Sequence, residues 1–338
     1  MKKRFIALFM AAASVLTLVA CGDKAADSGD VTAEDNKEYV IRVAFENNPG
    51  EPVYQAVEKW VELAAEKTDG RLVLEMYPSS QLGNKKDITE QMMMGADVIT
   101  ISDGAALMDY APDVGIIAAP YLVDNFEQMD KLTSSDWFAE SCEPLGDMGL
   151  TVLASNWHYG VMHMMTKKPV SSPADLKGMK IRCPSSAFYI SGIEAMGATP
   201  TPMALSDVYT SLSQDVVDGL FNPVPVLYAG NYHEQAGYLD LTGHIHLQSI
   251  WIGSKDFMDS LPDDIYNALI ESGREAGEFV NDINDEAYNE ALDAMVAAGV
   301  EVVETDTDAF REKVQPLYEN NKEWSEGLYE KAMAVLNG

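Results

Sequence analysis

Arg182 is the residue whose type and position most clearly indicate chemistry. It ends the β-type stretch 179–182 and precedes Pro184, after which Ser185 or Ser186 begins a helix. A guanidinium presents two parallel N–H donors that match the two oxygens of a carboxylate, whereas lysine supplies only a point charge. Because strand ends and helix N-termini commonly line binding clefts, we expect Arg182 to face an anion. The alternative is a structural ion pair at the end of the strand.

The other chemistry-bearing residue types form no catalytic or metal-binding pattern. None of the five histidines lies in an H-E-x-x-H sequence or beside a cysteine pair, so zinc chemistry has little support. The sequence also has no Walker phosphate-binding loop and no G-x-S-x-G turn. Cys183 has no histidine and acid at a recognisable spacing, so we interpret it as a small apolar group rather than a nucleophile. These features predict a protein that is not an enzyme and uses no metal or cofactor.

The elements that must position Arg182 alternate between strand and helix. In the first block the β-type apolar runs and the helical periods follow one another as in α/β proteins. Its members are predicted strands at 39–45, 71–77 and 96–101 and predicted helices at 52–67 and 87–94. About 300 residues follow the N-terminal segment, more than one core usually fills, so we expect two lobes.

A second block of the same kind begins after Gly160. Ser172 and Pro173 have the N-cap and first-turn types of a short helix, which Gly178 would end. The block continues as strand 179–182, a helix closed by Gly197, a helix capped at 206–207 and strand 216–221. Apolar positions then keep a helical period from Pro262 to about Ala298, which predicts one long helix that runs across both lobes.

The amino-terminal residues predict export and lipidation. Lys2, Lys3 and Arg4 precede an apolar run too short to span a membrane as a helix, which is typical of a signal peptide over residues 1–20. The run ends in the sequence LVACG, which resembles a lipobox, so Cys21 is the predicted lipidated residue. Residues 22–37 are rich in Asp, Ala, Ser and Gly, so we interpret 21–38 as the lipidated cysteine and a flexible tether.

Charge and cysteine content narrow the partners further. The formal charge of −31 falls to about −34 when the signal peptide, with its three basic residues, is removed. Such a polyanion is a poor partner for nucleic acid or for anionic lipid headgroups, so the membrane link should be the lipid alone. Cys142 and Cys183 remain as one possible disulfide pair outside the cytoplasm, and the sequence leaves open whether they join.

From about residue 39 to 335, the chain resembles the DctP-type solute-binding proteins of tripartite ATP-independent periplasmic (TRAP) transporters. The matching stretches are YPSSQLG at 77–83, PADLKGMKIR at 173–182, GATPTPM at 197–203 and VDGLFNP at 217–223. The resemblance implies a periplasmic-binding-protein-like fold of two α/β sandwich lobes with a hinge, bridged by the long helix. We assign residues 39–159 with about 248–287 to lobe I, and residues 160–247 with about 288–338 to lobe II.

The resemblance also implies a function and its main residues. Proteins of this family bind a small organic acid between the lobes, without chemistry, and deliver it to a small and a large membrane subunit. The family's carboxylate-binding arginine falls on Arg182, and its hydrogen-bonding asparagine falls on Asn222, next to Phe221. The expected location is the extracytoplasmic face of the cell membrane, through the lipid at Cys21.

Two departures from the family pattern bear on the ligand. Several members carry a second arginine where this chain has Met162, and relatives that bind sialic acid place an aromatic residue where this chain has Leu205. Both changes make the pocket less polar or less aromatic, which argues against a sugar acid with many hydroxyl groups. Glu46 and Asp103 fall where relatives approach ligand, although each could instead bond local backbone.

Two ligand classes therefore stay open. If Glu46 or Asp103 meets a cation, the ligand is an amino acid or similar zwitterion. Otherwise it is a monocarboxylate with an apolar or aromatic body, which the sequence slightly favours. The candidate wall residues are Trp157, His158, Tyr159, Met162 and Trp251. An alternative function, as the ligand-binding subunit of an ATP-driven importer or of a sensor, would use similar binding chemistry.

Overall fold

One β-sheet of nine strands organises the residues that the structure describes. The computed structural model describes residues 37–338, and residues 38–338 form one compact unit. The predicted signal peptide, Cys21 and nearly all of the predicted tether lie outside the described residues. The strands are β1 (Tyr39–Ala44), β2 (Leu72–Tyr77), β3 (Val98–Asp103), β4 (Leu150–Thr166), β5 (Lys180–Cys183), β6 (Thr199–Pro202), β7 (Gly219–Asn222), β8 (Tyr238–Ser254) and β9 (Glu301–Val303).

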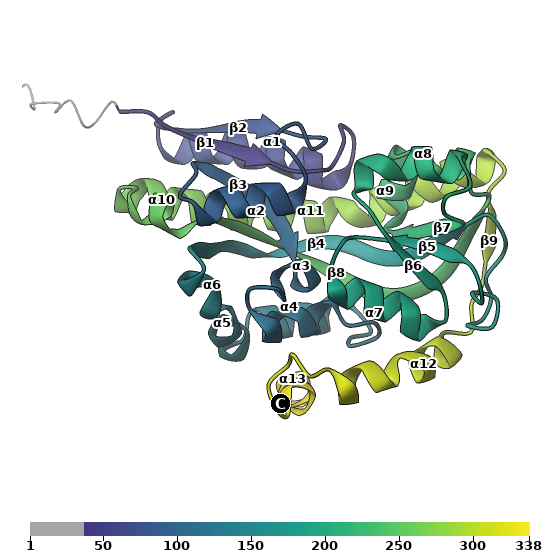
Figure 1. Cartoon of the computed structure of the whole chain (residues 1–338). Helices are drawn as coiled ribbons and strands as arrows, with labels where there is room; N and C mark the ends of the chain where they lie inside the picture. Colours follow the sequence, from purple (N-terminus) through teal and green to yellow (C-terminus); the bar gives the residue numbers. More distant parts are fainter. Residues whose placement is uncertain (1–36) are drawn as a thin grey trace, which may run out of the picture. The chain divides into compact units, whose positions relative to one another are not determined.

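The strand order places two parallel groups on either side of a long antiparallel pair. The order is β2-β1-β3-β8-β4-β7-β5-β6, with β9 paired to β8. The strands of β2-β1-β3 are parallel, as are those of β7-β5-β6, whereas β8 and β4 run antiparallel to each other and to β3 and β7. Figure 1 shows β4 and β8 running through the middle of this arrangement.

The central pair carries several irregularities where its pairing shifts. Register shifts in β4 lie between Val152 and Ala154, Ala154 and Trp157, His158 and Gly160, and Met162 and Met164. The two predicted lobe boundaries, at residues 159–160 and 247–248, fall inside β4 and β8, where Gly160 pairs with Leu247. The division into lobes at those positions stays a prediction.

Helices cover the sheet and join its strands (Figure 1). The α-helices are α1 (Pro52–Lys67), α2 (Lys85–Met93), α3 (Gly104–Leu107), α4 (Phe126–Thr133), α5 (Asp136–Cys142), α6 (Pro144–Asp147), α7 (Ala187–Met196), α8 (Val208–Ser213), α9 (Val224–Ala229), α10 (Lys255–Asp259), α11 (Asp263–Ala297), α12 (Thr307–Asn320) and α13 (Leu328–Asn337). The 3₁₀ helices are η1 (Pro112–Ala118), η2 (Leu205–Asp207) and η3 (Tyr232–Glu234).

Helix α11 is anchored by three buried tryptophans. Trp60, Trp157 and Trp251 pack with ring centroids 5.1–5.7 Å apart. The indole N–H of Trp157 donates to the carbonyl of Gly273 at 2.8 Å. A Cβ at Gly273 would lie 2.8 Å from Trp60, and one at Gly277 would lie 2.6 Å from Trp157, so only glycine permits this close approach of the helix.

The sequence predicted several helices well and one short helix wrongly. The predicted helix at 52–67 coincides with α1, the long helix is α11 with 35 residues, and α7 begins after Ser186 and ends at Gly197, as expected. The predicted helix at 172–178 is wrong, because these residues form turns. The carboxylate of Asp175 there accepts bonds from the backbone N–H groups of Ser171 and Ser172, which offers the backbone an alternative to helical bonding.

Candidate functional site

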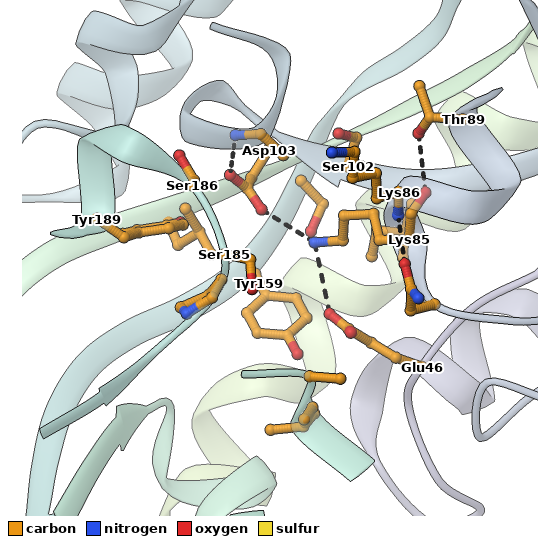
Figure 2. Close-up of a pocket in the computed structure, with 18 of the residues that line it drawn as sticks. Glu46, Lys85, Lys86, Thr89, Ser102, Asp103, Tyr159, Ser185, Ser186 and Tyr189 are labelled. Carbon is orange, nitrogen blue, oxygen red and sulfur yellow. Dashed lines mark hydrogen bonds and ion pairs between the residues drawn. The ribbon is translucent and has the colours of Figure 1, made fainter. Parts of the chain in front are cut away.

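The carboxyl ends of the parallel strands open onto one cavity of about 340 Å³. Arg182 lies at the end of β5, Asn222 at the end of β7 and Asp103 at the end of β3, while Glu46 follows β1 by two residues. The two parallel groups run in opposite directions, from the two ends of the β4–β8 pair toward its middle. The carboxyl ends of both groups therefore meet there and bring these side chains together, as ligand sites in open α/β sheets also lie at carboxyl ends. Figure 2 shows the polar side chains of this cavity.

The Arg182 end of the cavity holds a cation without a carboxylate partner. Arg182 is 4% exposed, and its Nε and Nη2 atoms donate to the carbonyl oxygen of Met203 at 3.1 and 2.9 Å. Within residues 37–338 no carboxylate forms an ion pair with it. Burial lowers the pKa of Arg182 below its usual value, partly opposed by the more distant Glu46. A buried, uncompensated guanidinium is costly, so this end favours a bound anion.

Asn222 adds a second unused donor to the same end. It is 6% exposed and lines the cavity, and its Nδ2 atom has no hydrogen-bond partner among the described residues. A buried donor without an acceptor costs free energy, which a ligand oxygen would recover. Arg182 and Asn222 therefore form a donor pair suited to a carboxylate.

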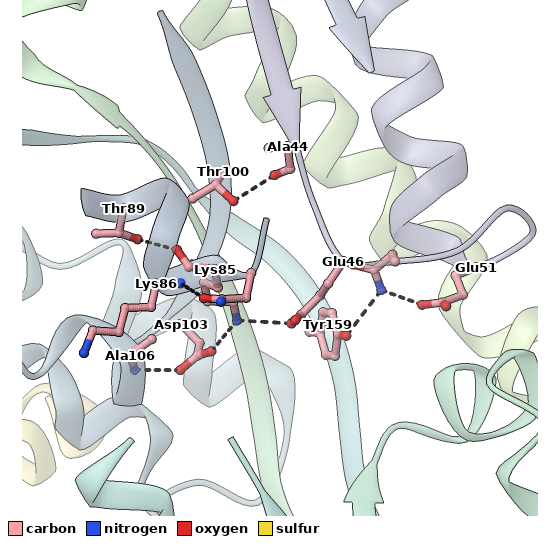
Figure 3. Close-up of polar contacts among 12 residues, drawn as sticks. Ala44, Glu46, Glu51, Lys85, Lys86, Thr89, Thr100, Asp103, Ala106 and Tyr159 are labelled. Atoms are coloured by element: carbon pink, nitrogen blue, oxygen red, sulfur yellow. Dashed lines mark hydrogen bonds and ion pairs between the residues drawn. The ribbon is translucent and has the colours of Figure 1, made fainter. Parts of the chain in front are cut away.

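The opposite end of the cavity contains one ammonium paired with two carboxylates. The Nζ atom of Lys85 lies 3.0 Å from Asp103 Oδ2 and 3.4 Å from Glu46 Oε1, contacts that Figures 2 and 3 both show. Asp103 also accepts the backbone N–H of Ala106 at 2.9 Å as the N-cap of α3. Burial would lower the pKa of Lys85, but Asp103 and Glu46 raise it above its usual value. This group of three charges is stable without a ligand.

Four more predicted residues line the same cavity. Tyr159 and Met162 come from β4, Phe221 from β7 and Leu205 from η2. The structure thus brings together eight residues that the sequence nominated, namely Arg182, Asn222, Asp103, Glu46, Tyr159, Met162, Leu205 and Phe221.

The remaining three nominated residues lie elsewhere in the fold. Trp157 and Trp251 are fully buried in the tryptophan cluster against α11, not in the lining of the cavity. His158 stacks on Phe126 at 4.1 Å and its Nε2 lies 2.8 Å from Asp130 Oδ1. The register shift between His158 and Gly160 separates Trp157 from Tyr159, which strand alternation alone would place on the same face.

A family model described as "Bacterial extracellular solute-binding protein, family 7" matches residues 43–323. The chain belongs to this family.

Individual relatives agree with the family 7 assignment. The C4-dicarboxylate-binding periplasmic protein DctP of Rhodobacter capsulatus is 30% identical over 244 residues, which cover 71% of this chain and 72% of the relative. A TRAP periplasmic solute-binding protein of Ochrobacterium anthropi, solved with bound L-fuconate, is 42% identical with a TM-score of 0.87 and covers 89% of this chain and 100% of that chain. One from Actinobacillus succinogenes, with bound L-galactonate, is 40% identical with a TM-score of 0.87 and covers 88% and 99%.

These comparisons confirm two predictions made from the sequence. The chain is a TRAP-type solute-binding protein of family 7, and its fold class is the two-lobed α/β class of periplasmic binding proteins. Proteins of this kind bind small ligands for membrane subunits and are not enzymes as a family.

Lys85 is the main residue of the family 7 site that the sequence prediction missed. It was hidden because the helix was predicted to begin at residue 87, whereas α2 begins at Lys85. Asn84 caps that helix by accepting from the backbone N–H groups of Lys86 and Asp87 at 3.0 and 3.1 Å. An Asn three residues before an acid is the signal that would have found this first turn and its lysine. Other missed lining residues are Ser102, Ser185, Ser186 and Tyr189.

Cys142 and Cys183, the cysteines that the structure describes, are unpaired. Cys142 is partly buried and Cys183 is buried, and both are free thiols. Burial raises the pKa of Cys142 to about 12 and that of Cys183 to about 11, so neither is an activated thiolate.

Residues 37–338 contain neither a metal-binding cluster nor a membrane-spanning helix. No cluster there of three or more His, Cys, Asp or Glu side chains is arranged to hold a metal ion. No helix in the same range is both long and apolar enough to cross a membrane.

Proposed function

We propose that this protein captures a hydroxylated monocarboxylate, such as an aldonate, and delivers it to the membrane subunits of a TRAP transporter. The observation that carries the proposal is the buried guanidinium of Arg182, which has no carboxylate partner among residues 37–338 and faces the cavity beside the unused donor of Asn222. A ligand carboxylate there would accept from both side chains. Such charge-assisted bonds are stronger than neutral ones.

The body of the ligand is proposed from the other end of the cavity. Lys85, Asp103 and Glu46 supply donors and acceptors together, and Ser102, Ser185 and Ser186 add hydroxyl groups nearby. Hydroxyl groups both donate and accept, so a hydroxylated chain matches this lining better than the apolar body that the sequence favoured. The bound L-fuconate and L-galactonate of the two solved structures described above are ligands of this class.

The same charges disfavour the other ligand classes. A second ligand carboxylate would approach Glu46 and Asp103, and a ligand ammonium would have to displace Lys85 from both of them. Met162, where several relatives carry arginine, adds no cation to offset a second carboxylate. The proposal is therefore a single carboxylate with a neutral, polar body.

We also propose that the protein acts at the extracytoplasmic face of the cell membrane. The support is the LVACG sequence after the apolar run of residues 5–20, which makes Cys21 the lipidated residue. Labelling of the expressed protein with a radioactive fatty acid, with Cys21→Ser as the control, tests the anchor. Equal labelling of both proteins would exclude it.

Isothermal titration calorimetry of the purified protein tests the ligand class. L-fuconate and L-galactonate should bind, whereas succinate and benzoate, which represent the dicarboxylate and apolar classes, should bind at least about tenfold more weakly. Tighter binding of benzoate would return the ligand to the apolar class. No binding by any carboxylate would overturn the proposal.

A further inference from the structure

The loop between β1 and α1 places two buried polar side chains directly behind the cavity. Asn47 is 0% exposed and Glu51 is 1% exposed, and neither lines the cavity. The Nδ2 atom of Asn47 donates both to Glu51 Oε2, at 2.5 Å, and to the hydroxyl oxygen of Tyr159, at 3.3 Å. Figure 3 shows these contacts, which join Glu51 to Tyr159 through Asn47. Tyr159 is therefore the point at which this buried chain reaches the cavity.

The bonds to Glu51 determine how the Asn47 amide is oriented. Glu51 Oε1 already accepts from the backbone N–H and the Nδ2 atom of Asn48, at 2.9 and 3.1 Å. The other oxygen, Oε2, faces Asn47 alone. An ionised carboxylate only accepts hydrogen bonds, so it holds the NH₂ group of Asn47 toward itself and toward Tyr159.

That orientation fixes what the Tyr159 hydroxyl can do. Its oxygen accepts from Asn47, and no described group accepts its proton. The phenol must therefore donate to something in the cavity, where Arg182 and Asn222 already offer donors. Tyr159 thus becomes a third donor for a ligand oxygen for as long as Asn47 keeps this orientation.

The Asn47 amide is held in place on one side only. Its Oδ1 atom is buried and has no partner among the described residues. Turning the amide over would therefore break the two bonds donated by Nδ2 but no bond made by Oδ1. The orientation depends on whether Glu51 accepts or donates at Oε2.

We propose that Glu51 is a positioning residue that sets the direction of the Tyr159 hydrogen bond, so that a proton on Glu51 weakens ligand capture. The proton binds Oε2, because Oε1 is occupied by two donors. The neutral acid then donates to Asn47 Oδ1, the amide turns over, and Tyr159 donates to Oδ1 instead of to the ligand. This inference rests on the proposed carboxylate site.

The environment of Glu51 allows this proton near neutral pH. Burial raises the pKa of Glu51 to about 7, opposed by the bonds from Asn48 and Asn47 and slightly increased by Glu46. The other titratable groups that face it are Tyr159 on β4 and Tyr232 in η3, and burial raises the pKa of both phenols, that of Tyr232 to about 12. Neither phenol ionises near pH 7, so the pH dependence belongs to Glu51.

Through Glu51, a fall in pH lowers ligand affinity but raises the stability of the unliganded fold. Ligand prefers ionised Glu51, so affinity is high above pH 7 and falls as pH drops through about 7. The unliganded fold prefers neutral Glu51, because its pKa is raised. That contribution to stability is complete below about pH 4.5 and is lost as pH rises through about 7.

The test is the dissociation constant of L-fuconate, measured by calorimetry from pH 5.5 to 8.5. The ligand carboxyl group is ionised throughout this range, with a pKa of about 3.5. In the wild-type protein the constant should rise about three- to tenfold between pH 8 and pH 6, the worth of one neutral hydrogen bond. Glu51→Gln should bind ligand weakly at all pH values. The oxygen of the introduced amide accepts from Asn48, and its NH₂ group donates to Asn47 Oδ1, which holds the Asn47 amide in the turned-over orientation.

Two further variants distinguish an effect of Glu51 on the Tyr159 hydrogen bond from a general loss of stability. Tyr159→Phe should bind weakly and independently of pH, and adding Glu51→Gln to it should cause no further loss. Asp240 is the matched control, because it is buried with a pKa raised to about 7 but bonds Thr166 and Val170 away from the cavity. Asp240→Asn should therefore keep the wild-type pH profile.

The results that would overturn the role of Glu51 differ from those that would overturn the proposed function. A wild-type profile that is flat, or one that Tyr159→Phe leaves unchanged, would overturn the inference while leaving the carboxylate site intact. If L-fuconate does not bind but another carboxylate does, the same pH series is measured with that carboxylate and decides the inference. Absence of binding by any carboxylate would overturn the proposed function itself. If Glu51→Gln does not fold, the wild-type and Tyr159→Phe profiles decide.

Discussion

The two ends of the cavity differ in whether their cation is paired with a carboxylate. At one end Arg182 is buried and bonded only to the carbonyl of Met203, and Asn222 has a donor without an acceptor. At the other end the ammonium of Lys85 is shared between Asp103 and Glu46. At one end a cation has no carboxylate partner, whereas at the other end one cation has two carboxylate partners.

This difference indicates how binding energy and selectivity are divided. An unpaired buried cation gains most from an anion, so the Arg182 end should supply most of the affinity. An ammonium that two carboxylates already pair gains little from a further anion, and the excess carboxylate charge repels one, although the group can still bond to hydroxyl groups. The Lys85 end should therefore decide which carboxylates are accepted.

The largest expected effect breaks the Arg182 end. Arg182→Ala should weaken L-fuconate binding by about 2 to 5 kcal/mol, the typical loss when a charge is left unpaired in a buried site. Calorimetry measures it, and the matched control is Lys86→Ala, because Lys86 is an exposed cation at the rim of the same cavity. Unchanged affinity in a folded Arg182→Ala protein would remove the carboxylate from this end.

The second effect comes from removing the cation of the Lys85 end. Lys85→Met should lower the free energy of unfolding by about 1 to 3 kcal/mol, because Asp103 loses its cation while 6% exposed, and partial exposure of Lys85 and Glu46 limits the loss. Urea denaturation at neutral pH measures it. The double variant Lys85→Met, Asp103→Asn should recover most of the stability, because asparagine also caps α3. No recovery of stability would show that Lys85 and Asp103 are not paired as described.

The third experiment tries to make the Arg182 end accept a second anion. Met162→Arg should shift the preference between succinate and L-fuconate by about 1 to 2 kcal/mol toward succinate, because a second guanidinium can bind a second carboxylate. Competition calorimetry measures the ratio, and Met162→Leu serves as a control of similar volume. A variant that still ignores succinate would show that Glu46 and Asp103 override the added cation.

The smallest effect concerns the neutral donor. Asn222→Ala should weaken L-fuconate binding by about 0.5 to 1.5 kcal/mol, the net worth of one hydrogen bond. Asn222→Asp is the informative partner variant, since its carboxylate would repel the ligand and should cost more than alanine. Equal affinities of the three proteins would show that Asn222 does not contact the ligand.

Regular patterns allowed much of the fold to be predicted from the sequence. The helical periods gave α1 and α11 because their apolar positions recur over many turns. Those of α11 enter two hydrophobic clusters in succession, with Ile265 in the first and Met295 in the second. The strands β4 and β8, of 17 residues each, were not predicted at that length. Their register shifts interrupt the alternation of buried and exposed side chains, so no single period describes them.

The same irregularity limited the prediction of the site. Arg182 and Asn222 end short regular strands, and motif and geometry agree on them. Trp157 precedes a register shift, so its side chain enters the core although Tyr159, two residues later, lines the cavity. Lys85 begins α2 and Asp103 ends β3, so their pairing depends on how the helix packs against the strand, and local patterns do not contain that information.

Three of the five tryptophans form the buried cluster, and their optical signals should report unfolding rather than binding. Trp60, Trp157 and Trp251 are fully buried, lie outside the cavity lining and pack 5.1–5.7 Å apart. Indoles at such separations couple electronically and are shielded from solvent and from ligand. Their near-ultraviolet circular dichroism should therefore vanish on unfolding and change little on binding. None of the five tryptophans lines the cavity, so a fluorescence assay that needs an indole in contact with ligand requires an introduced tryptophan, for example at Tyr110, which lines the cavity.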